Sequence, residues 1–453
     1  MGKFWGGIVE KRRKLAILPV TLNFTSLYPQ VFHKKIFQII RRKLEFSTRK
    51  VPTILILLFS FILILFPSNL AKHFIFSQSY VLGLLIDYLS PALYLTEILV
   101  VLLLLLSLPQ LLRRKFSPSP KKLLILGGIF LAALLPSVWQ GSFDLIGIWR
   151  WLELALWLGF GFWVAVFVGE KGQKNVFSLL GIAVFWVSLL ALGQFLTQHS
   201  IFGYWFLGEP ELSPSLGGMA LGSWGGKEVL RAYGTFPHPN VLGGILSVIL
   251  VWLAGQKRWA TFGAGAGAVL FSLSKTAWVS LLGGLGVFFL LSFKSLFPSV
   301  AAVTLGDWQL RDDYSVTRRI ELLESAGEMV KSSPWVGVGL GQFTRTLPDF
   351  GTPTGLSLFV QPAHNIFALV AAESGVLALM AFLALLFFAF RQTIRHRQWW
   401  LTISLIQLFF LGMFDHYLYT LPQGLFLFSL VLGLSFSEEG SGRTSSETAS
   451  PPG

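Results

Sequence analysis

The sequence contains no cysteine and few charged residues. Asp, Glu, Lys and Arg make up 13% of the 453 residues, whereas a soluble domain carries about a quarter. The absence of cysteine excludes disulfides, thiolate nucleophiles and cysteine-ligated metals. The scarcity of charge excludes an ordinary soluble globule, and the hydrophobic content of 53% excludes a chain that is disordered as a whole.

Long apolar runs dominate the sequence that remains. Runs long enough to cross a membrane occur at about 51–67, 91–112, 123–139, 146–168, 175–197, 239–255, 259–274, 276–293, 365–390, 399–414 and 421–436. Basic connectors would place the ends of both 276–293 and 365–390 in the cytoplasm, so another segment must cross the membrane between these two spans. A short, irregular span at 295–306 removes this conflict. The sequence therefore predicts an all-α polytopic membrane protein with about twelve transmembrane helices and both termini cytoplasmic.

The net charge of +14 is concentrated in one arm of the chain. Residues 1–50 carry twelve Lys or Arg and two acids, which is typical of a cytoplasmic flank that can also touch anionic lipids. We therefore expect no nucleic-acid partner. The transmembrane domain would span 51–437, and a tail at 438–453, rich in Ser, Thr, Gly and Pro, is predicted to be disordered. The large loop 307–364 faces the outside in this plan.

One helix within the large loop has an amphipathic pattern. Ile320, Leu323, Gly327 and Val330 recur at helical spacing. An amphipathic helix on the membrane surface is the natural interpretation.

The segment from Arg231 to Asn240 lies at the predicted outer mouth of a span. Pro237 and Pro239 restrict the backbone, and Asn240 is expected to cap the following helix. Basic residues orient a membrane protein from the cytoplasmic side, so Arg231 at an outer mouth has no such role. Its planar guanidinium suits a phosphate group. The alternative is an arginine that only reaches for the membrane interface.

Two further polar side chains are predicted at the outer surface. Lys275 lies in a turn between two apolar runs, where a positive charge suggests an anionic partner, although a polar turn is the alternative. His364 opens the span after the large loop, and histidine is suited to proton transfer near neutral pH. From the residues alone, a lone histidine is more often structural than catalytic. No sequence motif for a metal is present, and none is expected.

Few acids occur within the apolar runs. Glu97, Glu153 and Glu373 lie in or near predicted spans, and Glu153 can pair with Arg150 on one helix face. Ionisable groups inside a membrane are functional candidates, but three scattered acids do not form a proton relay.

Several motifs follow one another along the chain: Arg231 with Pro237-His-Pro-Asn240, Ser272-Leu-Ser-Lys-Thr276, Arg319-Ile-Glu-Leu-Leu-Glu-Ser-Ala326, Ser333 to Phe343, Pro362-Ala-His-Asn-Ile-Phe and Glu373-Ser-Gly375. Their order resembles the O-antigen ligase and polymerase superfamily of bacterial membrane glycosyltransferases, which are similar to the GT-C class. The resemblance is strongest over about residues 175–435.

The resemblance implies a reaction and its residues. A glycan would pass from an undecaprenyl-diphosphate carrier to a hydroxyl of a lipid, glycan or protein acceptor, without a cofactor, at the outer face of the bacterial plasma membrane. Arg231 and Lys275 would hold the diphosphate, although Lys275 stands where the family usually has arginine. His364 would be the base, and His238, Arg319 and Asn365 would complete the predicted substrate site.

Two other functions remain alternatives. Some members of the superfamily have been described as carriers of inorganic carbon, so a transporter of a small anion is the first. A structural scaffold for envelope assembly is the second. The predicted outer placement of Arg231, Lys275 and His364 favours the enzyme, because the three residues would then share one face.

Overall fold

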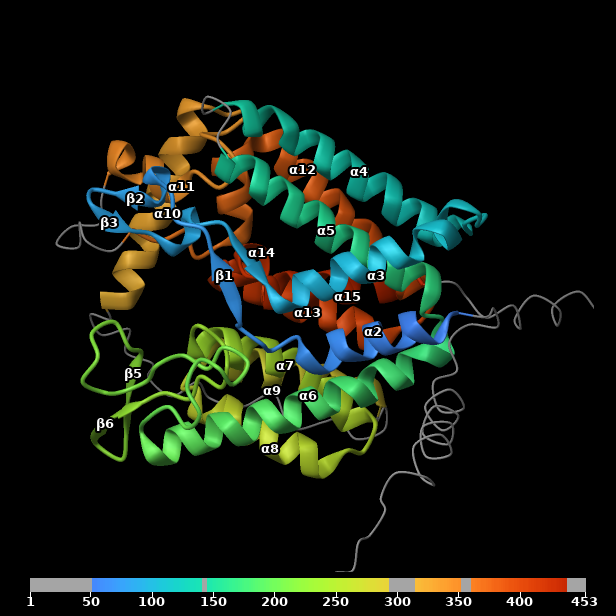
Figure 1. Ribbon diagram of the computed structural model, residues 1–453, viewed down its shortest axis with the longest axis horizontal. Helices are drawn as coiled ribbons and strands as arrows, with labels where there is room; N and C mark the ends of the chain where they lie inside the picture. Colours follow the sequence, from blue (N-terminus) through green and yellow to red (C-terminus); the bar gives the residue numbers. More distant parts are fainter. Residues whose placement is uncertain (1–50, 141–144, 293–313, 352–359, 438–453) are drawn as a thin grey trace, which may run out of the picture. The chain divides into compact units, whose positions relative to one another are not determined.

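The described part of the chain comprises residues 51–140, 145–292, 314–351 and 360–437 of a computed structural model (Figure 1). These residues belong to the compact unit Leu44–Gly453. The predicted arm 1–50, the tail 438–453 and the short span 295–306 lie outside the described residues.

Long apolar helices form most of the described chain. Five are long and apolar enough to cross a membrane: α3 (Leu95–Leu112), α4 (Pro118–Trp139), α5 (Leu145–Phe167), α6 (Glu170–Thr197) and α12 (Ile366–Arg395). Six shorter apolar helices accompany them: α2 (Thr53–Leu65), α7 (Pro239–Gly255), α8 (Trp259–Phe271), α9 (Lys275–Ser292), α13 (Trp399–Phe414) and α15 (Pro422–Ser435). This mostly helical structure agrees with an all-α membrane protein, and the total of twelve spans stays a prediction.

Three of these helices begin at positions that local sequence chemistry defines. Pro239 and Pro422 occupy the first positions of α7 and α15, where a missing backbone N–H and a fixed φ cost nothing. Asn365 caps α12, and its Oδ1 accepts hydrogen bonds from the backbone N–H groups of Phe367 and Ala368 at 2.9 Å. All three helix starts lie close to the cavity described below.

The helices pack closely where small residues face each other. α5 packs against α15 and α4, and α4 also packs against α12. At the α5–α15 contact, a Cβ on Gly161 would lie 2.8 Å from the carbonyl oxygen of Ser429, and one on Gly433 would lie 2.4 Å from that of Gly161. Because neither position has room for a side chain, the two backbones approach directly, as small residues allow between helices in a membrane.

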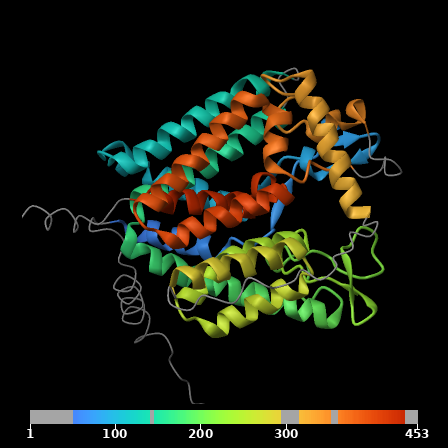
Figure 2. The same cartoon turned by 180° about the vertical axis from the view of Figure 1, so that it is seen from behind.

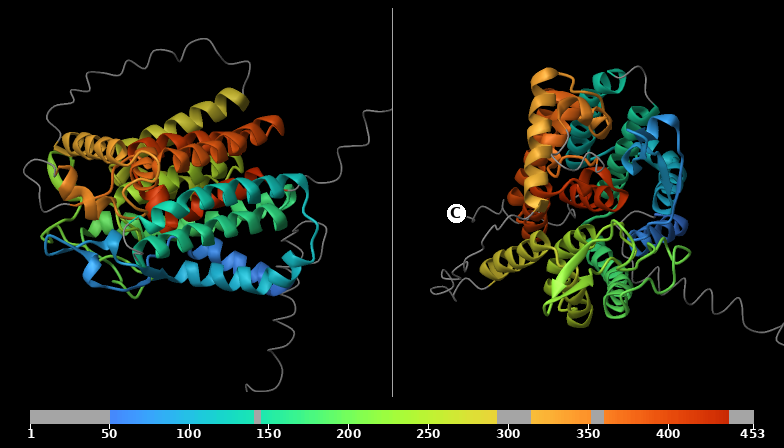
Figure 3. Two further views of the ribbon diagram at one scale, coloured as in Figure 1. Left: turned by 90° about the horizontal axis from the view of Figure 1, so that it is seen from above. Right: turned by 90° about the vertical axis from the view of Figure 1, so that its left-hand side faces the viewer.

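Short strands connect the helices, and an all-α expectation did not include them. β1 (Ala71–His73) pairs with β4 (Ala92–Tyr94), β2 (Tyr80–Val81) with β3 (Leu84–Leu85), and β5 (Leu221–Trp224) with β6 (Lys227–Leu230), all antiparallel. The 3₁₀ turns η1 (Ser77–Ser79) and η2 (Asp87–Leu89) lie between β1 and β4. These strands lie near the same ends of the long helices as α10 and α11 (Figure 3).

The predicted amphipathic helix is present as α10 (Tyr314–Ser332), which packs along α12 (Figure 2). Its buried side chains are Leu322, Ala326 and Met329, whereas Ile320 and Leu323 of the predicted stripe are exposed. The predicted stripe is therefore divided, since Ile320, Leu323 and Gly327 are exposed whereas Val330 is partly buried against the core. α11 (Phe343–Thr346) and η3 (Leu347–Phe350) follow it.

A kink in α12 brings together two motifs of the sequence analysis, the segment Ser333 to Phe343 and the segment Glu373-Ser-Gly375. Gly375 has φ of 79°, and a Cβ there would lie 2.2 Å from the carbonyl oxygen of Trp335. The kink frees backbone groups that bind the connector after α10: Val376 N–H donates to Pro334 at 2.8 Å, and Gly339 N–H donates to the Glu373 carbonyl at 3.0 Å. The connector therefore carries Gly341 and Thr344 to the cavity wall.

Candidate functional site

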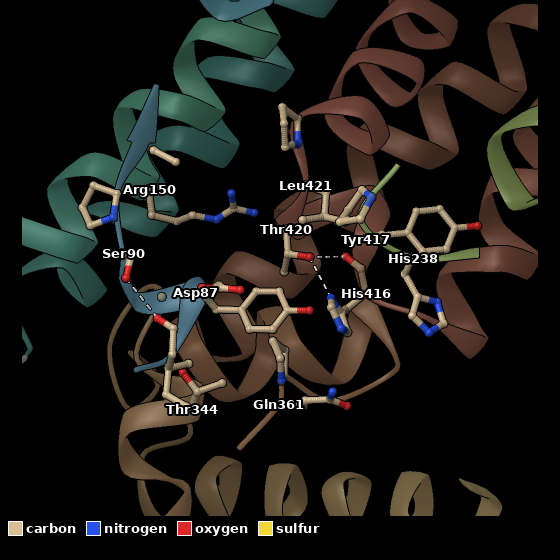
Figure 4. A pocket seen from close by; sticks show the side chains of 18 of the residues that line it. Asp87, Ser90, Arg150, His238, Thr344, Gln361, His416, Tyr417, Thr420 and Leu421 are labelled. Carbon is tan, nitrogen blue, oxygen red and sulfur yellow. Dashed lines mark hydrogen bonds between the residues drawn. The ribbon is translucent and has the colours of Figure 1, made fainter. Parts of the chain in front are cut away.

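A cavity of about 650 Å³ lies among the connectors and helix ends (Figure 4). This volume is within the range of sites for small molecules and cofactors. Its polar lining includes Asp87, Arg150, Glu153, His238, Asn240, Gln361, His364, Glu373, Asp415, His416 and Thr420. The lining comes from segments far apart in the sequence, so only the packed helices create the site.

His238 begins the polar wall at the start of α7. It is the N-cap of this helix, and its Nδ1 accepts a hydrogen bond from the backbone N–H of Asn240 at 3.1 Å. The expectation that Asn240 caps α7 is therefore wrong, because the cap lies two residues earlier, at His238, and the helix begins at Pro239. Burial and the nearby charge of Arg231 lower the pKa of His238 to about 4, so the imidazole is neutral at pH 7.

The side chain of Asn240 links Arg231 to the cavity lining. Its Oδ1 accepts a hydrogen bond of 2.6 Å from Nη2 of Arg231, and its Nδ2 lies 3.5 Å from Oδ2 of Asp415. Arg231 also donates from Nε to the carbonyl oxygen of Ser272 at 2.6 Å. Burial lowers the pKa of Arg231 to about 10 against the opposing effect of Tyr233, and nearby Arg319 lowers it further, which leaves Arg231 charged at pH 7. Arg231 is thus held directly behind the lining, in contact with it through Asn240.

His364, Asp415 and His416 form the centre of the polar wall. The possible ligand atoms of the three side chains lie within 4.8 Å of one another. The two imidazole rings are 5.2 Å apart at an angle of 76°. Nδ1 of His364 is buried and has no hydrogen-bond partner among the described residues. Nδ1 of His416 lies 2.7 Å from Oγ1 of Thr420, in the short helix α14 (Tyr417–Thr420).

The three side chains differ in charge at pH 7. Burial lowers the pKa of His364, and nearby Arg319 lowers it further against the opposing effect of Asp415. Burial likewise lowers the pKa of His416 to about 3. Burial alone would raise the pKa of Asp415, but the surrounding histidines and Arg319 bring it below its ordinary value. The group therefore consists of two neutral imidazoles beside one carboxylate.

This trio also has the ligand types of a metal site. Two imidazole nitrogens and one carboxylate oxygen suit zinc and similar divalent ions. The sequence shows no such motif, because His364 precedes α12 while Asp415 and His416 follow α13. The antiparallel packing of α12 and α13 brings them together.

The other predicted site residues have different positions. Lys275 is the first residue of α9, is exposed and does not line the cavity. Arg319, on α10, is half-buried, and its charge acts on Arg231, His238, His364 and Asp415. Asn365 caps α12 and donates from Nδ2 to the carbonyl oxygen of Met413 at 3.2 Å. Its side chain thus stabilises the helix start and does not line the cavity.

Sequence reasoning missed much of the remaining lining. Asp415 and His416 were not singled out, although polar residues after an apolar run are a usable signal. Arg150, Glu153 and Glu373 were noted but given no role. The predicted pair within α5 is confirmed, since Nη1 of Arg150 lies 2.5 Å from Oε2 of Glu153.

A comparison with known protein families finds a match over part of the chain. Residues 241–383 match a family model described as O-antigen ligase. This stretch of the chain is therefore similar to the O-antigen ligases. This confirms the resemblance found in the motifs, over a shorter stretch than the motifs covered. A search of curated proteins finds no match.

The O-antigen ligase match contains some of the polar wall but not all of it. His364 and Glu373 lie within the matched residues, whereas Arg231, His238, Asp415 and His416 lie outside them. The similarity to O-antigen ligases and the apolar helices together support a membrane protein with a role in glycosyl transfer, with a lipid-linked glycan and an acceptor as partners in general.

Proposed function

We propose that this protein transfers a glycan from an undecaprenyl-diphosphate carrier to an acceptor hydroxyl. The acceptor oxygen attacks the anomeric carbon, and the bond from this carbon to the diphosphate oxygen breaks. The electron pair leaves with the diphosphate, and the configuration at the sugar inverts. Diphosphate is a good leaving group, so no covalent intermediate with the protein is needed.

The observation that carries this proposal is the neutral imidazole of His364 in the cavity wall beside the carboxylate of Asp415. A neutral imidazole can accept the proton that the acceptor hydroxyl releases, which is worth about 10²- to 10⁴-fold in rate. Asp415 stabilises the imidazolium that forms, because an opposite charge nearby favours the charged form. Asp415 thus acts through His364 and is a positioning residue.

Arg231 is the proposed contact for the diphosphate. It is charged, tied to the lining through Asn240, and accompanied by the charge of Arg319. Fixed positive groups lower the barrier where negative charge grows on the departing oxygen. Lys275 is exposed on α9, so we assign it a weaker, longer-range effect than Arg231.

The cavity lining supports an outward-facing site. The lining comes from segments within 69–94, 146–153, 218–241, 341–364 and 415–422, together with Glu373 near the start of α12. The distribution of basic connectors supports the proposal that these helix ends and connectors face the outside of the plasma membrane. A cavity at one end of the helices favours an enzyme over a carrier, whose substrate site is expected near the middle of the membrane.

Reconstitution tests the proposal. Purified protein is incubated with an undecaprenyl-diphosphate glycan and a panel of lipid, glycan and protein acceptors, and the product is followed by mass spectrometry. We expect transfer without added metal, and we expect His364→Ala to abolish it while the protein remains folded. His199→Ala is the matched control, because His199 is an exposed histidine outside the cavity lining.

Two outcomes would contradict the proposal. Full transfer by His364→Ala would remove the proposed base. Flux of a small anion into proteoliposomes, in the absence of any lipid-linked sugar and of any transfer product, would favour the carrier instead.

A further inference from the structure

One wall of the cavity has no part in the proposed chemistry. We call it the α5 wall and define it as Trp149, Arg150 and Glu153 of α5 with Glu373 of α12, all of which line the cavity. Arg150 reaches into the cavity from the side opposite His238, and His416 lies between them (Figure 4).

Arg150 is held in a fixed orientation. Its Nη1 donates to Oε2 of Glu153 at 2.5 Å, and its guanidinium carbon lies 4.9 Å from the centre of the Tyr419 ring. Nη2 has no hydrogen-bond partner among the described residues. A buried donor without a partner costs free energy that a ligand oxygen can recover.

The charge of the α5 wall differs from that of the histidine side. Glu153 and Glu373 lie beside a single arginine, and Glu97 is buried close to Glu153. The arginine of this wall is already paired with Glu153, whereas Arg231 and Arg319 attract a diphosphate on the other side. Carboxylate oxygens and a guanidinium accept and donate hydrogen bonds to neutral hydroxyl groups, and the half-buried ring of Trp149 adds an apolar surface.

The order of the groups across the cavity fits an in-line displacement. In Figure 4, His416 lies between His238 and Arg150, so the trio separates the Arg231 side from the α5 wall. If the diphosphate leaves toward Arg231, the attacking hydroxyl must approach the anomeric carbon from the opposite direction. A hydroxyl placed there is beside His364, and the rest of its molecule extends toward the α5 wall.

We propose that the α5 wall is the subsite for the acceptor glycan. Glu153, Glu373 and Arg150 bind hydroxyl groups of its terminal sugar, and Trp149 packs against the apolar face of the ring. The ligand class is a neutral hexose rather than an anionic sugar, because the charge of the one arginine is already paired with Glu153. This inference rests on the proposed function for the direction of attack, but the binding site itself can be tested without it.

The first experiment measures binding without a donor. Purified protein in nanodiscs is titrated with octyl β-D-glucopyranoside or octyl β-D-galactopyranoside below the concentration at which they form micelles, and saturation-transfer NMR reports contacts to the sugar protons. Octyl tetraethylene glycol ether is the control probe, because it has the same alkyl chain and no sugar. We expect sugar-ring contacts with at least one glycoside, and a Kd about tenfold higher in Trp149→Ala.

Three variants sharpen this test. Arg150→Gln should weaken sugar binding to a similar extent, but it leaves the buried Glu153 without its partner and can prevent folding, so Trp149→Ala carries the test in that case. Trp205→Ala is the matched control, since Trp205 is 92% exposed and outside the lining. Arg231→Gln should bind the glycosides as the native protein does. Equal binding of the sugar-free ether, or unchanged sugar binding in Trp149→Ala, overturns the proposal.

The second experiment separates this subsite from the transfer reaction. In steady-state kinetics, Trp149→Ala should raise KM for the acceptor and leave KM for the donor nearly unchanged, whereas Arg231→Gln should do the reverse. Sugar binding that persists in a protein without transfer activity would remove the proposed function and keep the subsite. A rise in donor KM alone in Trp149→Ala would remove the subsite and keep the proposed function.

Discussion

A ring nitrogen of His364 and a carboxylate oxygen of Asp415 lie within 4.8 Å of each other in the cavity wall. His364 precedes α12 and Asp415 follows α13, so the antiparallel pairing of the two helices creates this contact. The carboxylate raises the pKa of the imidazole against the stronger effect of burial. Several consequences can be measured.

Asp415→Asn should lower kcat and change its dependence on pH. A base works only when unprotonated, so transfer by the native protein should fall as pH drops through the pKa of His364, which lies below the ordinary value of about 6.5. Removing the carboxylate lowers this pKa further, so the acidic limb should move to lower pH while the plateau decreases. Profiles of kcat against pH check this. An acidic limb that stays in place would show that Asp415 does not act on His364.

Added zinc should inhibit the protein, whereas chelators should not. His364, Asp415 and His416 offer zinc ligands, and a zinc-bound imidazole cannot accept a proton. Transfer measured with EDTA and then with increasing Zn²⁺ should give full activity followed by inhibition that weakens at lower pH, where protons compete for the imidazoles. In His416→Gln, the fold-inhibition at a given Zn²⁺ concentration should be smaller. Loss of activity with EDTA, restored by Zn²⁺, would instead make the trio a catalytic metal site.

Arg231→Gln should raise KM for the donor more than Lys275→Gln does. Arg231 is joined to the lining by its hydrogen bond to Asn240, whereas Lys275 is exposed and outside the lining. A change of about tenfold or more is expected for Arg231, because a charge-assisted contact to diphosphate is worth about 1.5–3 kcal/mol. Donor kinetics for the two variants check this order. A larger effect at Lys275 would show that the diphosphate binds at the outer turn instead.

Gly375→Ala should destabilise the protein by about 1–3 kcal/mol. The residue has φ of 79°, and a Cβ would lie 2.2 Å from the carbonyl oxygen of Trp335. Thermal unfolding in detergent should show a lower Tm, together with a higher acceptor KM because Glu373 lies just before the kink. Gly286→Ala is the control, since a Cβ at that helical position meets nothing within 4 Å. An unchanged Tm for Gly375→Ala would mean that α12 does not need this kink.

The apolar runs and the family could be predicted from the sequence because both depend on local patterns. A run of apolar residues forms a helix in a membrane wherever it occurs, so α3, α5 and α12 follow from their own residues. Arg150 and Glu153 are also local, being one turn apart, and their pair was predicted correctly. The short strands were missed because pieces of two or three residues have no period to detect.

The site was only partly predictable. Motif order pointed to His364 and Arg231, but it could not exclude Lys275 from the lining or show that Asn365 is used as a helix cap. It also could not join Asp415 and His416 to His364, because nothing in the sequence near Asp415 reports how α12 and α13 pack.

The sequence by itself determined that this chain is a helical membrane protein with a stretch similar to O-antigen ligases, because hydrophobicity and motif order are properties of the chain. Only the tertiary structure decided which polar groups share a cavity. Helix packing placed neutral imidazoles and a carboxylate at its centre, with Arg231 behind one wall and Arg150 on the other. The physical reason is that burial and neighbouring charges, which set the chemistry of each side chain, depend on contacts between helices.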